Sequence, residues 1–246
     1  MEPDAIIDQY LDAKRGIRAS IDGKNSALLI IDMQEYQVRE NSAIAKFFGS
    51  FAPGIFDYYA KRVESLVEPN LVRLMDFFHE NKLPVILTRY ASFRPDKKDY
   101  PPHIQMFNAL SESTIHEPIF PDQSHPSTRI VPKLEVKQTP SDIVLLKTTS
   151  CAFTSTDLDH TLRNLNVSTV FIGGVVTNFC VESAARIASD LGFRAIIIDD
   201  ASAAWAPSLH AASLRTFEML YGDVMTTDAI IKQVMKSLKK STKAEK

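Results

Sequence analysis

A thiol lies where a strand-like apolar run gives way to a helix-like pattern. Residues 170–186 read VFIGGVVTNFCVESAAR, so the run breaks at Gly173 and Gly174, and Cys180 lies in the break. The first backbone N–H groups of a helix favour negative charge, and thiols at such positions are found with lowered pKa values. We therefore interpret Cys180 as a nucleophile and ask which other groups would assist it.

Two charged side chains lie at the ends of other strand-like runs. Asp32 ends the apolar part of SALLIIDM at residues 26–33, and Lys147 ends DIVLLK at residues 142–147. A carboxylate can take the proton from a thiol and return it to a leaving amine, while an ammonium stabilises the resulting ion pair. Asp32, Lys147 and Cys180 together predict acyl transfer through a covalent intermediate.

Acyl transfer also needs hydrogen-bond donors for the oxyanion that forms on the substrate carbonyl. The turn GGVVTNFC offers backbone N–H groups, and we predict those of Val176 and Cys180 as the donors. This prediction requires the turn to direct both groups toward the same oxygen.

Alternating strand-like and helix-like segments must position these side chains. The strand-like runs are residues 26–33, 84–90, 142–147, 169–174, 194–200 and 223–227, and the helix-like patterns are residues 4–15, 62–81, 154–165, about 180–191, 208–221 and a last one from 228. This alternation favours an α/β fold whose parallel sheet is covered on both faces. In such a sheet the ligand crevice lies outside the carboxyl ends of the strands, where the three reactive side chains fall.

Two segments show no clear period. Residues 42–60 are aromatic and are interrupted by Pro53 and Gly54, so we expect them to be irregular and to cover a pocket or meet another subunit. Residues 91–140 are rich in proline, and we expect a long covering loop that contributes to substrate specificity.

The composition indicates one ordinary soluble domain, with 246 residues of which 45% are hydrophobic and 24% charged. We place a helical extension at residues 1–25, the main domain at 26–238 and a flexible tail at 239–246. The 28 basic and 30 acidic residues nearly balance, which argues against a nucleic-acid or anionic-membrane partner.

No signal-peptide pattern and no apolar stretch of roughly 18 residues is visible, so we expect a cytoplasmic protein with no membrane partner. The two cysteines, Cys151 and Cys180, are expected to be reduced, and Cys151 to be structural.

Four pieces of the chain carry a resemblance when they are taken together. In order they read LLIIDMQ, LLKTTSCAFTSTDL, GGVVTNFCVESAARIASDLGF and DDASAA, within roughly residues 24–235. Each piece is weak alone, but the set resembles the isochorismatase-like cysteine hydrolases, which include nicotinamidases, carbamoylsarcosine amidohydrolases and ureidoacrylate amidohydrolases.

The resemblance implies a fold, a site and a mechanism. The fold is a three-layer α/β/α, Rossmann-like arrangement with a six-stranded parallel sheet in the order 3-2-1-4-5-6. The site is a triad of Asp32, Lys147 and Cys180, with a cis peptide bond between Val175 and Val176. The mechanism proceeds through a thioester on Cys180. Because the third strand lies two positions from the first, Lys147 must lean across the second strand or lie on a segment that folds back.

Differences from family members narrow the expected substrate. Isochorismatases proper lack the nucleophilic cysteine, so Cys180 favours an amide-type bond over a vinyl ether. Nicotinamidases typically bind a metal through an aspartate and histidines after the first strand, where this chain offers only His79. We therefore predict no metal and no cofactor. The form TNFCVES is more similar to members that act on ureido or carbamoyl compounds.

Several further residues are predicted to contact the small-molecule substrate, and family members generally associate, which favours a homo-oligomer, either a dimer or a tetramer. The predicted substrate contacts are Gln34, Tyr36, Arg94, Asn178 and Trp205.

Simpler interpretations exist for each residue. Cysteines early in helices are most often buried apolar residues, Asp32 alone could be a cap, and Lys147 alone could be a solvated strand end. Only their joint spacing favours a catalytic site. Two other functions stay open: hydrolysis of a different acyl bond, such as an ester or a ring amide, and a non-catalytic binding module with a redox-sensitive Cys180.

Overall fold

A computed structural model describes residues 2–244 of the chain. Six strands form one sheet in which every neighbouring pair is parallel, in the order β3-β2-β1-β4-β5-β6. The strands are β1 (Ser26–Ile31), β2 (Val85–Tyr90), β3 (Ile143–Lys147), β4 (Thr169–Val175), β5 (Arg194–Ala203) and β6 (Asp223–Met225). The predicted fold class and strand order are confirmed.

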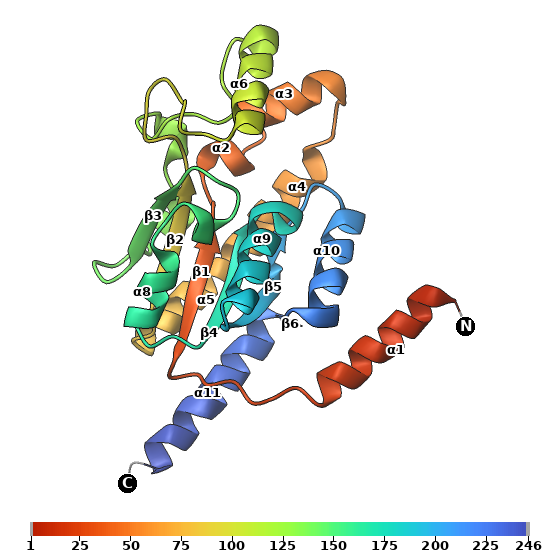
Figure 1. The fold of residues 1–246 in the computed structure, drawn as a ribbon, viewed down its shortest axis with the longest axis vertical. Coiled ribbons are helices and arrows are strands. Elements are labelled where there is room, and N and C mark those ends of the chain that lie inside the picture. The colour runs from red at the N-terminus through yellow and green to blue at the C-terminus, as the bar shows by residue number, and fades with distance from the viewer. Residues whose placement is uncertain (1, 245–246) are drawn as a thin grey trace.

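Helices cover both faces of the sheet (Figure 1). One face carries α4 (Asp57–Arg62), the π-helical turn η1 (Val63–Val67), α5 (Glu68–Glu80), α7 (Pro132–Glu135) and α11 (Thr227–Ala244). The other face carries α8 (Leu158–Asn164), α9 (Glu182–Asp190) and α10 (Pro207–Leu220). Strands β1 and β4 are buried along their whole length because helices cover them on both sides.

The carboxyl ends of the strands point toward three further helices, α2 (Glu35–Val38), α3 (Ala43–Phe51) and α6 (Pro102–Ile115) (Figure 1). Two expectations from the sequence are corrected here. The segment 42–60 is largely helical, since it contains α3 and most of α4, and the segment 91–140 contains α6 in place of an uninterrupted loop.

The two ends of the chain are helical. The first helix, α1 (Pro3–Gly16), extends away from the sheet and buries only Leu11 (Figure 1). The last helix continues to Ala244, so most of the predicted tail 239–246 is helical, and its final residues 245–246 lie outside the described part. No helix within residues 2–244 has the length and apolar character needed to span a bilayer.

Candidate active site

Asp32, Lys147 and Cys180 meet at the carboxyl edge of the sheet. The ammonium Nζ of Lys147 lies 2.7 Å from Oδ2 of Asp32 and 3.6 Å from Sγ of Cys180. Asp32 and Lys147 are fully buried, and Cys180 is 7% exposed. The structure therefore brings together the three side chains whose positions at strand ends first suggested acyl transfer.

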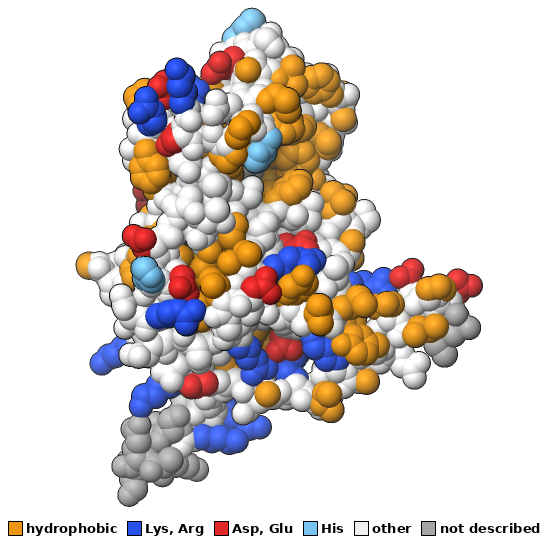
Figure 2. Space-filling view, in the orientation of Figure 1, with side chains coloured by type: hydrophobic (Ala, Val, Ile, Leu, Met, Phe, Trp, Pro, Cys, Tyr) orange, Lys and Arg blue, Asp and Glu red, His pale blue; other side chains and the backbone are white. Residues whose placement is uncertain are grey.

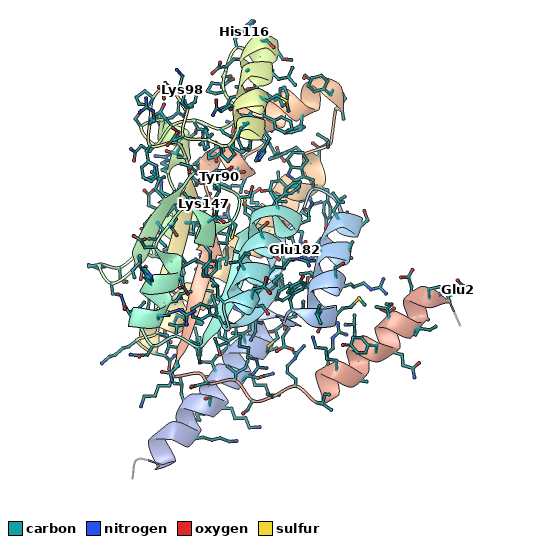
Figure 3. All side chains as sticks on the ribbon, in the orientation of Figure 1. Glu2, Tyr90, Lys98, His116, Lys147 and Glu182 are labelled. Atoms are coloured by element: carbon teal, nitrogen blue, oxygen red, sulfur yellow. The ribbon has the colours of Figure 1, made fainter. Side chains whose placement is uncertain are left out.

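Lys147 reaches Asp32 by leaning across β2. Its backbone pairs with that of Tyr90 in the sheet, and its ammonium lies 3.9 Å from the centre of the Tyr90 ring, a cation–π contact. Figure 3 shows the two side chains together at this end of the sheet. The ammonium also donates to the carbonyl oxygens of Thr149 and Ser150, at 2.9 and 3.0 Å. These contacts hold a long, flexible side chain in one position.

Asp32 is positioned by its own backbone and by Thr88 on β2. With φ at 51°, Asp32 adopts the left-handed conformation that aspartate tolerates better than most residues. The Thr88 hydroxyl accepts the Asp32 N–H at 3.1 Å and donates to Oδ1 at 2.7 Å. Oδ2 forms the ion pair with the Lys147 ammonium, and no other residue in 2–244 donates a hydrogen bond to it. Oδ2 is therefore the oxygen available to accept a thiol proton.

The turn after β4 carries Cys180. Gly174 has φ at 102°, and a Cβ atom there would lie 2.1 Å from the Ile31 carbonyl oxygen, so only glycine allows β4 to approach β1 this closely. The Val175–Val176 peptide is cis, as the resemblance implied. A π-helical turn, η4 (Thr177–Val181), follows and leads into α9. The Val176 carbonyl accepts the Phe179 and Val181 N–H groups and so starts this turn.

Burial dominates the acidity of the thiol. Burial, together with the charge of Asp32, raises the pKa of Cys180 to about 12, although Lys147 acts in the opposite direction. The expectation that a helix N-terminus lowers this pKa is therefore wrong for the free protein. Burial disfavours the charged form of Lys147 as well, but the facing Asp32 carboxylate and Cys180 raise its pKa overall. The resting site holds a neutral thiol beside an ammonium.

A cavity of about 310 Å³ opens beside Cys180. Its walls come from the segment after β1, from α6, from the ends of β2 and β4, and from the segment after β5. The residues that line it are Gln37, Ile44, Phe48, Tyr90, His103, Ile104, Phe107, Phe120, Ser150, Val176, Phe179, Cys180 and Trp205. The cavity has the size of a small-molecule site.

Of the five predicted substrate contacts, Trp205 lines this cavity and the other four do not. The amide of Gln34 is buried and bonded to the Thr128 carbonyl and the Tyr90 N–H, at 2.7 and 2.6 Å. Gln34 therefore joins the ends of β1 and β2 and does not face a ligand.

The other three residues also lie outside the lining. The Tyr36 hydroxyl donates to the Tyr90 carbonyl at 2.6 Å. The Arg94 guanidinium is exposed and paired with Asp96. Asn178 lies in the turn before Cys180, half-buried and outside the cavity wall.

Sequence reasoning missed several residues that the structure places at the site. Thr88 and Tyr90 lie in the run PVILTRY, where they look like ordinary strand residues. Phe107 lies on α6, inside the segment expected to be a loop. The aromatic content of residues 42–60 was a usable signal, because Phe48 from that segment forms part of the wall.

Within residues 2–244 no group of three or more histidine, cysteine, aspartate or glutamate side chains is arranged to hold a metal ion. His79 instead contacts Asp142 at 2.8 Å, away from the three triad side chains.

Comparison with known proteins gives three informative matches. A sequence model of the isochorismatase domain matches residues 26–229. Nicotinamidase 3 of Arabidopsis thaliana is 26% identical over 212 residues, covering 86% of this chain and 90% of that protein. The ureidoacrylate amidohydrolase RutB of Variovorax paradoxus is 34% identical over 99 residues, which are 40% of this chain and 39% of RutB.

Among solved structures, a cysteine hydrolase from Pseudomonas syringae pv. phaseolicola has a similar fold. It superposes with a TM-score of 0.73 at 22% identity and covers 89% of this chain and 97% of its own. At this identity the likeness concerns the fold alone.

Proposed function

The chain belongs to the isochorismatase family, and from this premise we propose that it is a cysteine-dependent amidohydrolase. It cleaves the C–N bond of a small amide, ureide or carbamoyl compound through a thioester on Cys180. The observation that carries the proposal is the position of the Lys147 ammonium, 2.7 Å from Asp32 and 3.6 Å from Cys180 beside a cavity of ligand size.

The proposed reaction has two halves. In the first, Sγ of Cys180 attacks the substrate carbonyl carbon while Oδ2 of Asp32 takes the thiol proton. Asp32 then gives this proton to the leaving nitrogen, the C–N bond breaks, and a thioester remains. In the second half Asp32 takes a proton from water, the hydroxide attacks the thioester, and the proton returns to Cys180. The products are a carboxylic or carbamic acid and an amine or ammonia.

The remaining groups stabilise charge. Lys147 stays protonated and faces both the carboxylate and the sulfur, so it stabilises the thiolate as it forms. The backbone N–H groups of Val176 and Cys180 are the proposed donors to the oxyanion. Because the resting thiol is neutral, the transfer of its proton to Asp32 accompanies the attack.

The second candidate for the cleaved bond is the amide of a carboxamide attached to a ring, such as that of nicotinamide. It is supported by the similarity to Nicotinamidase 3 over most of both chains. The chemistry at Cys180 would be the same, and only the ligand in the cavity would differ.

The test is an ammonia-release screen over simple amides, ureides and carbamoyl compounds, with the wild type beside Cys180→Ala. Removing the sulfur removes the nucleophile, so we expect activity to fall at least about a thousandfold. Cys151→Ala is the matched control, and it should keep activity. Mass spectrometry of the quenched wild type should show the acyl group on Cys180. Full activity in Cys180→Ala, or no turnover across the panel, would contradict the proposal, and the latter would favour a binding module.

A further inference from the structure

The cavity beside Cys180 is lined almost entirely by uncharged side chains. No lysine, arginine, aspartate or glutamate is among the lining residues, and His103, an exposed side chain, is the one histidine there. A ligand carboxylate in this cavity would lose its water and find no cation to pair with, which is costly.

Two arginines, one near the end of β2 and one in the segment that follows it, have partners away from the cavity. Arg94 pairs with Asp96 at 2.7 Å. Arg89 donates to the carbonyl and the hydroxyl of Thr128, at 3.0 and 2.9 Å. Lys147 already faces Asp32, whose own negative charge would repel a second carboxylate.

The cavity walls are aromatic and hold one another in place. Phe48 packs edge-on against Trp205, with ring centres 4.6 Å apart, and also contacts Phe107 at 6.3 Å. On the other side Tyr90 and Phe120 lie 5.5 Å apart. Flat walls of this kind favour a planar ring, which can stack or meet them edge-on.

One buried polar group in the wall makes no well-formed hydrogen bond. Tyr90 is 2% exposed, and its hydroxyl has no hydrogen bond of normal geometry within residues 2–244, although the Ser150 side chain in the same wall is close enough to act on its pKa. A buried hydroxyl that is left unsatisfied is costly, so a ligand that offers it an acceptor gains binding energy. The amide oxygen or a ring heteroatom of a substrate is an acceptor of this kind.

We propose that this cavity selects uncharged, planar aromatic amides, with Tyr90 as a hydrogen-bond donor to them, and disfavours substrates that carry a carboxylate. The inference rests on the proposed function for its chemistry and adds the class of substrate. It narrows the expected substrates among amides, ureides and carbamoyl compounds, because it disfavours ureides that carry a carboxylate.

Binding can be measured without turnover because Trp205 is the single tryptophan of the chain and lines the cavity. In the Cys180→Ala variant, titration with benzamide should change the tryptophan emission and saturate. The matched acid, 4-carbamoylbenzoate, should bind at least about tenfold more weakly. N-carbamoyl-β-alanine, an aliphatic acidic ureide, should bind as weakly as the matched acid or more weakly.

A positive charge placed in the cavity wall should remove the preference for benzamide over 4-carbamoylbenzoate. Phe107 lines the cavity from α6, and its neighbour Met106 is 60% exposed. In the Cys180→Ala background, Phe107→Arg should bring 4-carbamoylbenzoate to within about threefold of benzamide or better, whereas the matched control Met106→Arg should leave the preference unchanged. Replacing Tyr90 by phenylalanine should weaken benzamide about fivefold to tenfold by removing the donor.

The outcomes separate this inference from the proposed function. Equal or tighter binding of 4-carbamoylbenzoate in Cys180→Ala, or no saturable binding of benzamide, would overturn the inference even if the wild type released ammonia from acidic ureides. If Cys180→Ala prefers benzamide to 4-carbamoylbenzoate but the wild type turns over no substrate, the proposed ligand class is supported and the proposed hydrolase activity is contradicted. If Phe107→Arg fails to fold, the comparison of benzamide with 4-carbamoylbenzoate in Cys180→Ala is by itself sufficient to test the inference.

Discussion

Asp32 affects Cys180 in two opposite ways. Burial is the main reason that the pKa of Cys180 is raised, and the negative charge of Asp32 beside the thiol raises it further. The Oδ2 oxygen of Asp32 is also the acceptor that the proposed reaction requires. At this scale the site is a coupled set of three groups, in which changing one charge alters the ionisation of another.

This coupling predicts that Asp32→Asn lowers turnover but raises the rate at which Cys180 is alkylated. Turnover should fall at least about a thousandfold because the base is lost. Without the carboxylate, the pKa of Cys180 should move down toward its usual range, because Asp32 raises it and Lys147 lowers it. Each unit that this pKa falls toward the working pH gives about ten times more thiolate.

Alkylation by iodoacetamide at pH 8, followed by mass spectrometry of the Cys180 peptide, measures this effect. The rate should rise roughly tenfold in Asp32→Asn and should remain low in the wild type throughout the neutral range. Thr88→Val is a useful comparison, since it removes the two hydrogen bonds between the Thr88 hydroxyl and Asp32 but keeps the charge of Asp32. Slower alkylation in Asp32→Asn than in the wild type would contradict the assigned cause of the pKa shift.

At the level of the elements, the turn between β4 and α9 is also held in place by side chains of α10 and β5. The ring of His210, on α10, joins Asp199 of β5 and Thr177, the first residue of η4. Its Nε2 lies 2.9 Å from Asp199 and its Nδ1 2.9 Å from the Thr177 hydroxyl. The hydrogen bond with His210 lowers the pKa of Asp199, and the Arg62 guanidinium lies 3.1 Å from the same Nε2. The start of the turn that carries Cys180 is thereby fixed to β5 and α10.

We therefore predict that His210→Ala slows the reaction without touching the substrate. Loss of the support should misplace Val176 and Cys180 and lower kcat by roughly tenfold to a hundredfold, with KM changed much less. His160→Ala, which alters an exposed histidine on α8, is the matched control. Steady-state kinetics of both variants check the prediction, and an unchanged kcat in His210→Ala would show that the turn does not depend on this ring.

The elements also show how far sequence reasoning reaches. The six strands, and the placing of Asp32, Lys147 and Cys180 at one edge of the sheet, could be predicted because long apolar runs end at the first two and two glycines mark the break before the third. The crossing of Lys147 over Tyr90 could not be derived from any local pattern, because it depends on which strands are neighbours.

The helices above the sheet were missed for a different reason. On α6 the cavity-lining Phe107 is followed by exposed apolar residues such as Leu110, which is 45% exposed, and preceded by Met106. Apolar side chains therefore lie on more than one face of α6, and the period that normally identifies a surface helix is obscured. Figure 2 shows hydrophobic side chains gathered over this end of the molecule.

Across the whole molecule, α1 is joined to the rest mainly by polar contacts with α10 and the segment that follows it. Arg15 and Arg18 pair with Glu218 at 2.6 and 3.0 Å, and Tyr10 donates to the Met219 carbonyl. Glu218 is 2% exposed, whereas Arg15 and Arg18 are 47% and 15% exposed, so these pairs are buried on the α10 side only. The association of several copies of the chain stays a prediction, and Phe51 of α3, 65% exposed, is one side chain that such contacts would cover.

Deleting residues 1–18 should therefore leave the main domain folded and active. Glu218 is 2% exposed in the full chain but would become solvated once α1 is absent, so no buried charge is left unpaired. We expect Tm to fall by only about 2–5 °C, and activity to stay within about twofold. Circular dichroism melts and the ammonia-release assay test this. Loss of a cooperative transition in the shortened protein would show that α1 belongs to the core domain.

Lys147 lies at the end of an edge strand, so its contacts with Asp32 and Cys180 depend on the local stability of that strand. Native proteins open and close locally, and edge elements with partly exposed residues, such as those of β3, open more readily than central strands. We expect each opening of β3 to draw the ammonium away from Asp32 and Cys180 while β1 and β4 remain paired. The fraction of competent molecules should then depend on the stability of this strand, and amide exchange along β3 would measure it.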